Sequence, residues 1–177
     1  MRGINSGHGF TYTTYNRQTA IASMREDYDA GYRIMRVVQP TYDSNTNTVI
    51  MCKDLVQVAL DIGFEEVHWG VVGQRPVTAT SFTAHGNYIV NNLAPWAQAI
   101  NDPRLMLAIG NEEELHVDGT TLTVEDLRDG LKTVATNAKA VYTVGSIVYV
   151  TDAEQRDEWS ALGLGDIDLL GMNLYYE

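Results

Sequence analysis

Short apolar segments alternate with longer amphipathic ones along the whole chain. Six short segments are rich in Val, Ile, Leu and Met and mostly lack the alternation of a half-exposed sheet, which predicts buried strands. Because a parallel strand pair needs a crossover connection, and each longer segment can provide one, the pattern predicts a parallel α/β sheet. The predicted strands are Gly3–Asn5, Arg33–Gln39, Glu66–Gly73, Leu105–Gly110, Ser146–Thr151 and Ile167–Tyr175.

Helical spacing of apolar residues predicts five helices between these strands. The clearest begins at Thr123, where Thr123 and Asp126 suggest a variant capping box, and its apolar residues continue to Val141 at spacings of three and four. The segment Gly86–Ile100 contains Pro95, so we expect this helix to be kinked or split. The other helices are expected around residues 21–28, 55–62 and 152–162.

Two architectures fit this alternation, a doubly wound open sheet and a TIM (β/α)8 barrel. A dinucleotide-binding open sheet would have a glycine-rich turn after its first strand, but Gly7-His-Gly9 lacks the third glycine. The barrel is therefore favoured, with residues 1–177 as a single domain. About six β/α units are present, and strands seven and eight are missing. We expect a fragment, an incompletely known sequence, or a chain whose barrel is closed by another copy.

Composition and charge argue against several partners. The chain has 12 Lys and Arg against 23 Asp and Glu, a net charge of −11, and no basic cluster, so nucleic acid and anionic membranes are poor candidates. No apolar run approaches the roughly 18 residues of a membrane span. No signal peptide is visible, which leaves a cytoplasmic protein or a mature secreted domain with an added Met. The single cysteine, Cys52, fits a buried helix position better than a reactive thiol.

Polar and aromatic residues gather where the predicted strands end. The active site of a (β/α)8 barrel lies at the carboxyl ends of its strands, so these residues predict one shared site. Arg36, Trp69, Asn111, Glu112 and Tyr175 are expected to converge there. Further polar or aromatic residues at these strand ends are Asn5, Ser6, His8, Gln39, His68, Asn173 and Tyr176.

Segments on four of the strands together resemble the retaining glycoside hydrolases of the large (β/α)8 clan, family 5 and its relatives. The resemblance implies that Glu112 is the general acid/base and that Asn111 hydrogen-bonds the sugar 2-hydroxyl beside the cleaved bond. The substrate would be a β-linked oligo- or polysaccharide, and no cofactor is implied. The segments that carry the resemblance are Arg2-Gly-Ile-Asn5, Arg36, Ile109-Gly-Asn-Glu112 and Gly171-Met-Asn-Leu-Tyr175.

The chemistry of a retaining glycosidase needs two carboxyl groups. One protonates the leaving oxygen while a carboxylate about 5 Å away attacks the anomeric carbon. In the resembling family the attacking group is a Glu that ends strand seven, which is missing here, so this chain alone is expected to be nearly inactive. Glu177 would be the nucleophile only if a strand such as Asn47–Met51 has escaped the pattern.

The substrate-binding candidates each have a structural alternative. Arg36 orients a catalytic carboxylate or only pairs with an acidic neighbour. Trp69 and Tyr175 offer flat rings to the apolar faces of sugars, or pack in the core. His68 and Asn173 are further candidate sugar contacts. The run Glu112-Glu113-Glu114 could instead form a solvated acidic loop.

Other functions and a metal centre fit the sequence less well. No metal site is predicted, because Asn5-Ser-Gly-His8 lacks the His-x-His pair common on strand one of metal-dependent barrel hydrolases. His85 and His116 suit ordinary loop or helix positions. One alternative is a non-catalytic, carbohydrate-binding or structural module of a larger assembly. Another is an unrelated barrel enzyme such as an aldolase, against which stands the placement of Lys53, Lys132 and Lys139 on predicted helices.

Overall fold

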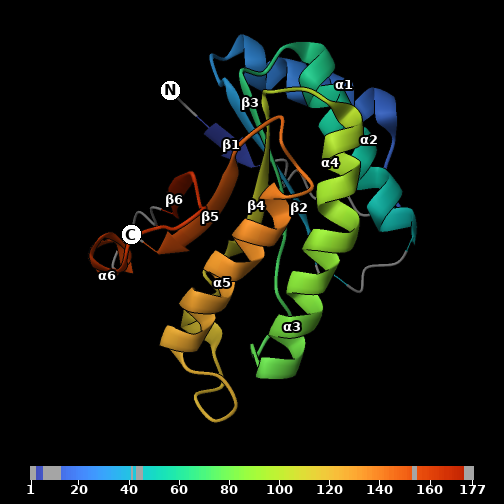
Figure 1. Ribbon diagram of the computed structural model, residues 1–177. Coiled ribbons are helices and arrows are strands. Elements are labelled where there is room, and N and C mark those ends of the chain that lie inside the picture. The colour runs from blue at the N-terminus through green and yellow to red at the C-terminus, as the bar shows by residue number, and fades with distance from the viewer. Residues whose placement is uncertain (1–2, 6–12, 41, 43–45, 153–154, 174–177) are drawn as a thin grey trace, which may run out of the picture.

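The computed structural model describes residues 3–5, 13–40, 42, 46–152 and 155–173 (Figure 1). Their strands form a six-stranded sheet in the order β1-β2-β3-β4-β5-β6, and every neighbouring pair is parallel. This sequential order confirms the barrel architecture, because a doubly wound sheet reverses its order at a switch point. The strands are β1 (Gly3–Asn5), β2 (Ile34–Gln39), β3 (Glu66–Val71), β4 (Leu105–Asn111), β5 (Ile147–Asp152) and β6 (Leu169–Asn173).

The helices connect successive strands, and α1 to α5 cover one face of the sheet (Figure 1). The described chain is therefore a partial (β/α)8 barrel with its helices outside. The helices are α1 (Arg17–Asp29), α2 (Thr46–Ile62), α3 (Ala79–Tyr88), the π-helical turn η1 (Ile89–Leu93), α4 (Ala94–Ile100), the 3-10 turn η2 (Glu113–His116), α5 (Val124–Lys139) and α6 (Arg156–Leu162).

The helix around Pro95 is split as expected, but it begins earlier than the sequence suggested. The π-helical turn η1 interrupts the α-helical hydrogen bonding between α3 and α4, and Pro95 is the second residue of α4. The wider π-helical turn before Pro95 accommodates its ring and its missing backbone N–H. The preceding helix α3 begins at Ala79 because Thr78 and Ser81 form a reciprocal capping box. Residues 47–51 lie within α2, so an extra strand at Asn47–Met51 is wrong.

The hydrophobic core lies between the sheet and the helices. Residues of β2 and β3 alternate between partly exposed and buried positions, and the buried ones face the helices. The sequence predicted strands without this alternation, which is wrong for β2 and for the first half of β3. In the described chain, the face of β2 and β3 that points away from the helices is accessible, and we call it the inner face.

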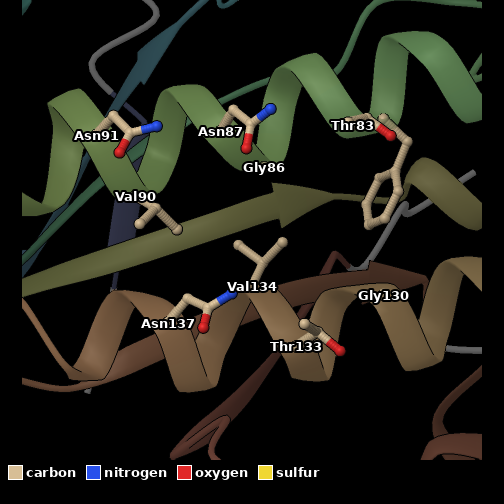
Figure 2. Close-up of a pocket in the computed structure, with 10 residues that line it drawn as sticks. Thr83, Gly86, Asn87, Val90, Asn91, Gly130, Thr133, Val134 and Asn137 are labelled. Carbon is tan, nitrogen blue, oxygen red and sulfur yellow. The ribbon is translucent and has the colours of Figure 1, made fainter.

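Helices α3 and α5 cross closely, and two glycines make the approach possible. A Cβ at Gly86 would lie 2.8 Å from Val134 Cγ2, and one at Gly130 would lie 2.3 Å from Phe82 Cε1. A groove of about 340 Å³ lies between α3–η1 and α5. Figure 2 shows the residues of the two helices that line it. It lies away from the strand ends and therefore does not belong to the predicted site.

Candidate active site

Arg36 and Asn111 meet on the inner face, as the sequence predicted. Arg36 Nη2 donates a hydrogen bond to Asn111 Oδ1 at 2.6 Å, which joins β2 to the end of β4 across β3. Asn111 pairs with Val150 of β5 after a break in register that follows Ala108. The bond fixes which end of the Asn111 amide faces the guanidinium. The two residues therefore form an oriented polar pair beside Glu112.

Glu112 follows β4 directly and adopts an unusual backbone conformation. Its φ of 56° and ψ of 31° lie in the left-handed region, which a non-glycine residue occupies at a cost of about 1 kcal/mol or more. Its backbone N–H donates to Val150 O at 2.7 Å. Glu112 is 4% exposed, and its two neighbours in the acidic run are buried as well. A solvated acidic loop is therefore wrong for all three glutamates.

His68 lies beside Arg36 on the inner face, since the two residues are in register between β2 and β3. Its Nε2 is 3.2 Å from Glu66 Oε2, two residues back along the same strand. Burial lowers the pKa of His68, although Glu66 opposes the effect. The imidazole is therefore mainly neutral at pH 7, with one donor and one acceptor nitrogen. Glu66 was missed because it begins its strand, whereas the sequence directed attention to strand ends.

Trp69 does not join this group, and its assignment as a sugar-binding ring is wrong. Adjacent residues of a strand point to opposite faces, so Trp69 faces the helices when His68 faces inward. It is 0% exposed and stacks on Trp96 of α4 at 6.1 Å between ring centroids. Lys53 in turn covers the ring of Trp96, with Nζ 3.4 Å from its centroid. A ring enclosed in this way has no surface to offer a substrate.

Glu113 lies in the turn after β4 and reaches back to β3. Its Oε1 accepts a hydrogen bond from the backbone N–H of Gly73 at 3.2 Å. Burial raises the pKa of Glu113 to about 7, against the opposing effect of the backbone N–H groups of Gly73, Glu113 itself and Asn111. The side chain therefore titrates near neutral pH and does not lie in a solvated loop, the alternative that the sequence left open.

Glu114 lies on the helix side of β5, where three side chains donate to its carboxylate. The hydroxyls of Tyr149 and Thr151 bind its two oxygens, and Trp159 Nε1 donates to Oε1 at 3.1 Å. Trp159 of α6 is itself 0% exposed. Three donors compensate the burial of one carboxylate, so Glu114 connects β5 and α6 to the turn after β4.

Several of the candidate residues are placed only in part or not at all. Asn173 ends β6 in register with Asp152, and nothing further is described of its side chain. The other candidates that lie outside the described residues are Ser6, His8, Tyr175, Tyr176 and Glu177. Within the described ranges, no group of three or more His, Cys, Asp or Glu side chains comes together as metal ligands.

Comparison with solved structures identifies the fold. An exo-β-1,4-mannosidase from Opitutaceae bacterium strain TAV5 matches 96% of this chain with a TM-score of 0.74 and 12% identity. An endo-1,4-β-mannanase from Eisenia fetida matches 94%, with a TM-score of 0.64 and 13% identity. A β-glucuronidase from Parabacteroides merdae matches 97%, with a TM-score of 0.63 and 12% identity. The fold that the chain shares with these three enzymes is part of a (β/α)8 barrel.

This partial barrel spans only a fraction of each similar structure. It covers 37% of the mannosidase, 63% of the mannanase and 24% of the glucuronidase. No family model and no curated protein sequence matches the chain. No helix among the described residues is long and apolar enough to cross a lipid bilayer.

The structure confirms the structural positions that the sequence predicted for Cys52 and His85. Cys52 is 1% exposed in α2, and burial raises the pKa of its thiol to about 12, which suits a buried apolar side chain. His85 of α3 is 1% exposed, with Nε2 2.9 Å from the carbonyl oxygen of Ile109. Since a carbonyl only accepts, His85 carries its proton on Nε2 in this contact and helps to support β4 from the helix side.

Proposed function

We propose that this chain is the part of a retaining glycoside hydrolase that carries the general acid/base, Glu112. One observation carries the proposal: Arg36 donates to Asn111 at 2.6 Å, immediately before Glu112, at the carboxyl end of β4. Active sites of (β/α)8 barrels are built at this end of the strands. The similar solved structures are named as a β-mannosidase, a β-mannanase and a β-glucuronidase, which favours a β-linked oligo- or polysaccharide as substrate.

In this proposal the three residues have separate roles. Glu112 protonates the leaving oxygen of the glycosidic bond and later removes a proton from the attacking water. Asn111 hydrogen-bonds the sugar 2-hydroxyl, and Arg36 holds the Asn111 amide in the orientation that this contact needs. His68 lies next to Arg36 in the sheet and is proposed as a further sugar contact. Asn173, at the end of β6, and Tyr175 complete the proposed binding set.

The nucleophile is proposed to be a glutamate outside this chain, at the end of a seventh strand. Residues 1–177 would then form one domain whose barrel is closed by two further β/α units or by self-association. The similar structures are all longer than this chain, which supports the first arrangement. With acid/base and nucleophile about 5 Å apart, hydrolysis would retain the anomeric configuration.

The experiment compares Glu112→Gln with the parent in a form extended through two further β/α units. Glutamine keeps the shape of Glu112 but donates no proton. The variant should therefore lose about 10²- to 10⁴-fold in kcat/KM, which reports the formation of the glycosyl-enzyme, on a β-linked disaccharide and much less on an aryl glycoside with a good leaving group. Equal losses on both substrates would contradict the role of Glu112. Binding of oligosaccharide without any turnover would instead favour a non-catalytic module.

The 177-residue chain itself provides a second arm of this experiment. Without a partner carboxylate, it should hydrolyse the same substrates several powers of ten more slowly than the extended form. Substantial hydrolysis by the 177-residue chain would contradict the proposed external nucleophile and would point to a carboxylate of this chain or of a second copy.

A further inference from the structure

Glu113 occupies a place between two strands that its position in an acidic run does not suggest. It is 2% exposed, at the start of the 3-10 turn η2. Its carboxyl group extends back beside β4, and Oε1 accepts from the N–H of Gly73, which follows β3. The side chain therefore ties the turn after β4 to the segment after β3.

Two glycines leave the room that this carboxyl group occupies. A Cβ at Gly110 would lie 2.5 Å from Glu113 Oε2, closer than Cβ atoms approach other atoms. A Cβ at Gly73 would lie 3.1 Å from Glu113 Cγ and 3.4 Å from Oε1. Close packing at both glycines means that the carboxyl group cannot move far without meeting backbone.

The residue between these two anchors is Glu112, in its left-handed conformation. On one side, the Glu112 N–H is bonded to Val150 O of β5 at 2.7 Å. On the other side, the side chain of Glu113 accepts a hydrogen bond from the backbone N–H of Gly73, which follows β3. A left-handed non-glycine residue persists only when its surroundings determine it, and these two bonds hold it from both directions.

We propose that Glu113 is a positioning residue, whose carboxyl group fixes the Asn111–Glu112 turn and thereby the direction in which the Glu112 side chain leaves β4. The proposal rests on the proposed function for the catalytic meaning of that direction. The structural claim stands by itself, since it concerns only the conformation of the turn. The backbone N–H groups of Gly73, Asn111 and Glu113 that oppose the raised pKa of Glu113 support the same placement.

The structural arm of the test measures backbone amide hydrogen exchange by NMR in the 177-residue chain. Glu113→Ala removes the acceptor, so the Gly73 and Glu112 amides should exchange at least about 10-fold faster, while amides in the middle of α5 keep their rates. Glu113→Gln retains a carbonyl acceptor for Gly73 and should stay within about 3-fold of the parent. Glu125→Gln, at an exposed glutamate in α5, is the matched control. An unchanged Glu112 amide in Glu113→Ala would overturn the proposal.

A second pair of variants keeps the test decisive if Glu113→Ala does not fold. Gly73→Ala displaces the Glu113 side chain by a few tenths of an ångström, because the three atoms nearest its added Cβ all belong to Glu113, the closest at 3.1 Å. It should speed exchange at Glu112 by a smaller factor than Glu113→Ala. Combining Gly73→Ala with Glu113→Gln should speed Glu112 amide exchange by the same factor as Gly73→Ala alone. If Gly73→Ala changes only the exchange of the amide at position 73, the proposal is overturned.

The catalytic arm uses the extended form and separates this proposal from the proposed function. Glu113→Ala should lower kcat on a disaccharide about 10-fold or more with KM within about 2-fold, and Glu113→Gln should restore most of the loss. If Glu112→Gln has no effect, the proposed function fails, while the exchange result still decides the structural claim. If Glu112→Gln is impaired and Glu113→Ala keeps full kcat, the positioning role is wrong.

Discussion

The two faces of the sheet use polar residues at the strand ends in different ways. On the inner face, Arg36 and His68 are partly exposed, and Arg36 is bonded to Asn111. On the helix side, Glu114 and His85 are fully enclosed and bonded within the protein. Polar groups on the helix side thus support the strand ends from behind, while those on the inner face remain able to meet a ligand.

A polar residue after a strand is therefore not by itself a site residue. Glu112, Glu113 and Glu114 are consecutive, yet Glu113 bonds to the segment after β3 and Glu114 to β5 and α6. Residues enclosed on the helix side, such as Glu114 and Trp69, should affect stability when changed, and Arg36 on the inner face should affect catalysis.

The largest effect is expected for Glu114→Ala. The change leaves the hydroxyls of Tyr149 and Thr151 and the indole N–H of Trp159 buried without their acceptor. With 1–3 kcal/mol for each such group and some relaxation, the free energy of unfolding should fall by about 4 kcal/mol. Urea denaturation of wild type and Glu114→Ala measures this loss of unfolding free energy. A loss below about 1 kcal/mol would mean that Glu114 is not the centre of this contact.

Glu113 should make stability depend on pH between its unfolded and folded pKa values. Burial raises the pKa from 4.5 to about 7, so the folded state holds the proton more tightly than the unfolded state. The resulting stabilisation is complete below pH 4.5 and is lost as the pH rises to about 7, by roughly 3 kcal/mol. Glutamine does not titrate, so the stability advantage of wild type over Glu113→Gln should shrink over this range. A constant difference from pH 4.5 to 8 would contradict the burial of this carboxyl group.

Arg36→Lys should affect catalysis more than stability. Lysine keeps the charge but loses the planar donor group that holds Asn111. In the extended form, kcat/KM should fall about 10- to 100-fold, or roughly 1.4–2.8 kcal/mol, with the melting temperature nearly unchanged. Arg25→Lys, at an exposed position in α1, is the matched control. Equal activity of the two variants would remove Arg36 from the site.

Trp69→Phe should affect stability and leave catalysis unchanged, and its effect should be the smallest of the four. The smaller ring loses part of the stacking on Trp96 but breaks no hydrogen bond found in the structure, so we expect a loss of about 1–2 kcal/mol in unfolding free energy. The KM for oligosaccharide in the extended form should not change. A raised KM with full stability would return Trp69 to the substrate site.

The sequence predicted the strands well because each is a short apolar run between helices with clear spacing. β4 begins at Leu105 as expected, and the helix after Thr123 has the expected capping box. The start of α3 was missed, since its cap at Thr78 and Ser81 lies outside the apolar pattern used to find the helix. Local patterns thus determine elements, while caps made by polar side chains shift their ends.

The site was predicted less completely, and for a geometric reason. His68 and Trp69 were both assigned to substrate, although adjacent strand residues cannot share a face. The strand alternation would have excluded one of them. The different surroundings of Glu113 and Glu114 depend on the left-handed Glu112 and the following 3-10 turn, which no periodic pattern reveals.

The central claim, that Glu112 is the acid/base of a retaining glycosidase, is tested most directly by azide rescue of Glu112→Ala in the extended form. Without the base, the glycosyl-enzyme formed from an activated aryl β-glycoside reacts slowly with water, but azide needs no base to attack it. The account predicts that azide raises turnover many-fold and yields the β-glycosyl azide, with Glu113→Ala giving no such product. An α-glycosyl azide would show that Glu112 is the nucleophile instead, and unchanged turnover without any glycosyl azide would contradict its catalytic role.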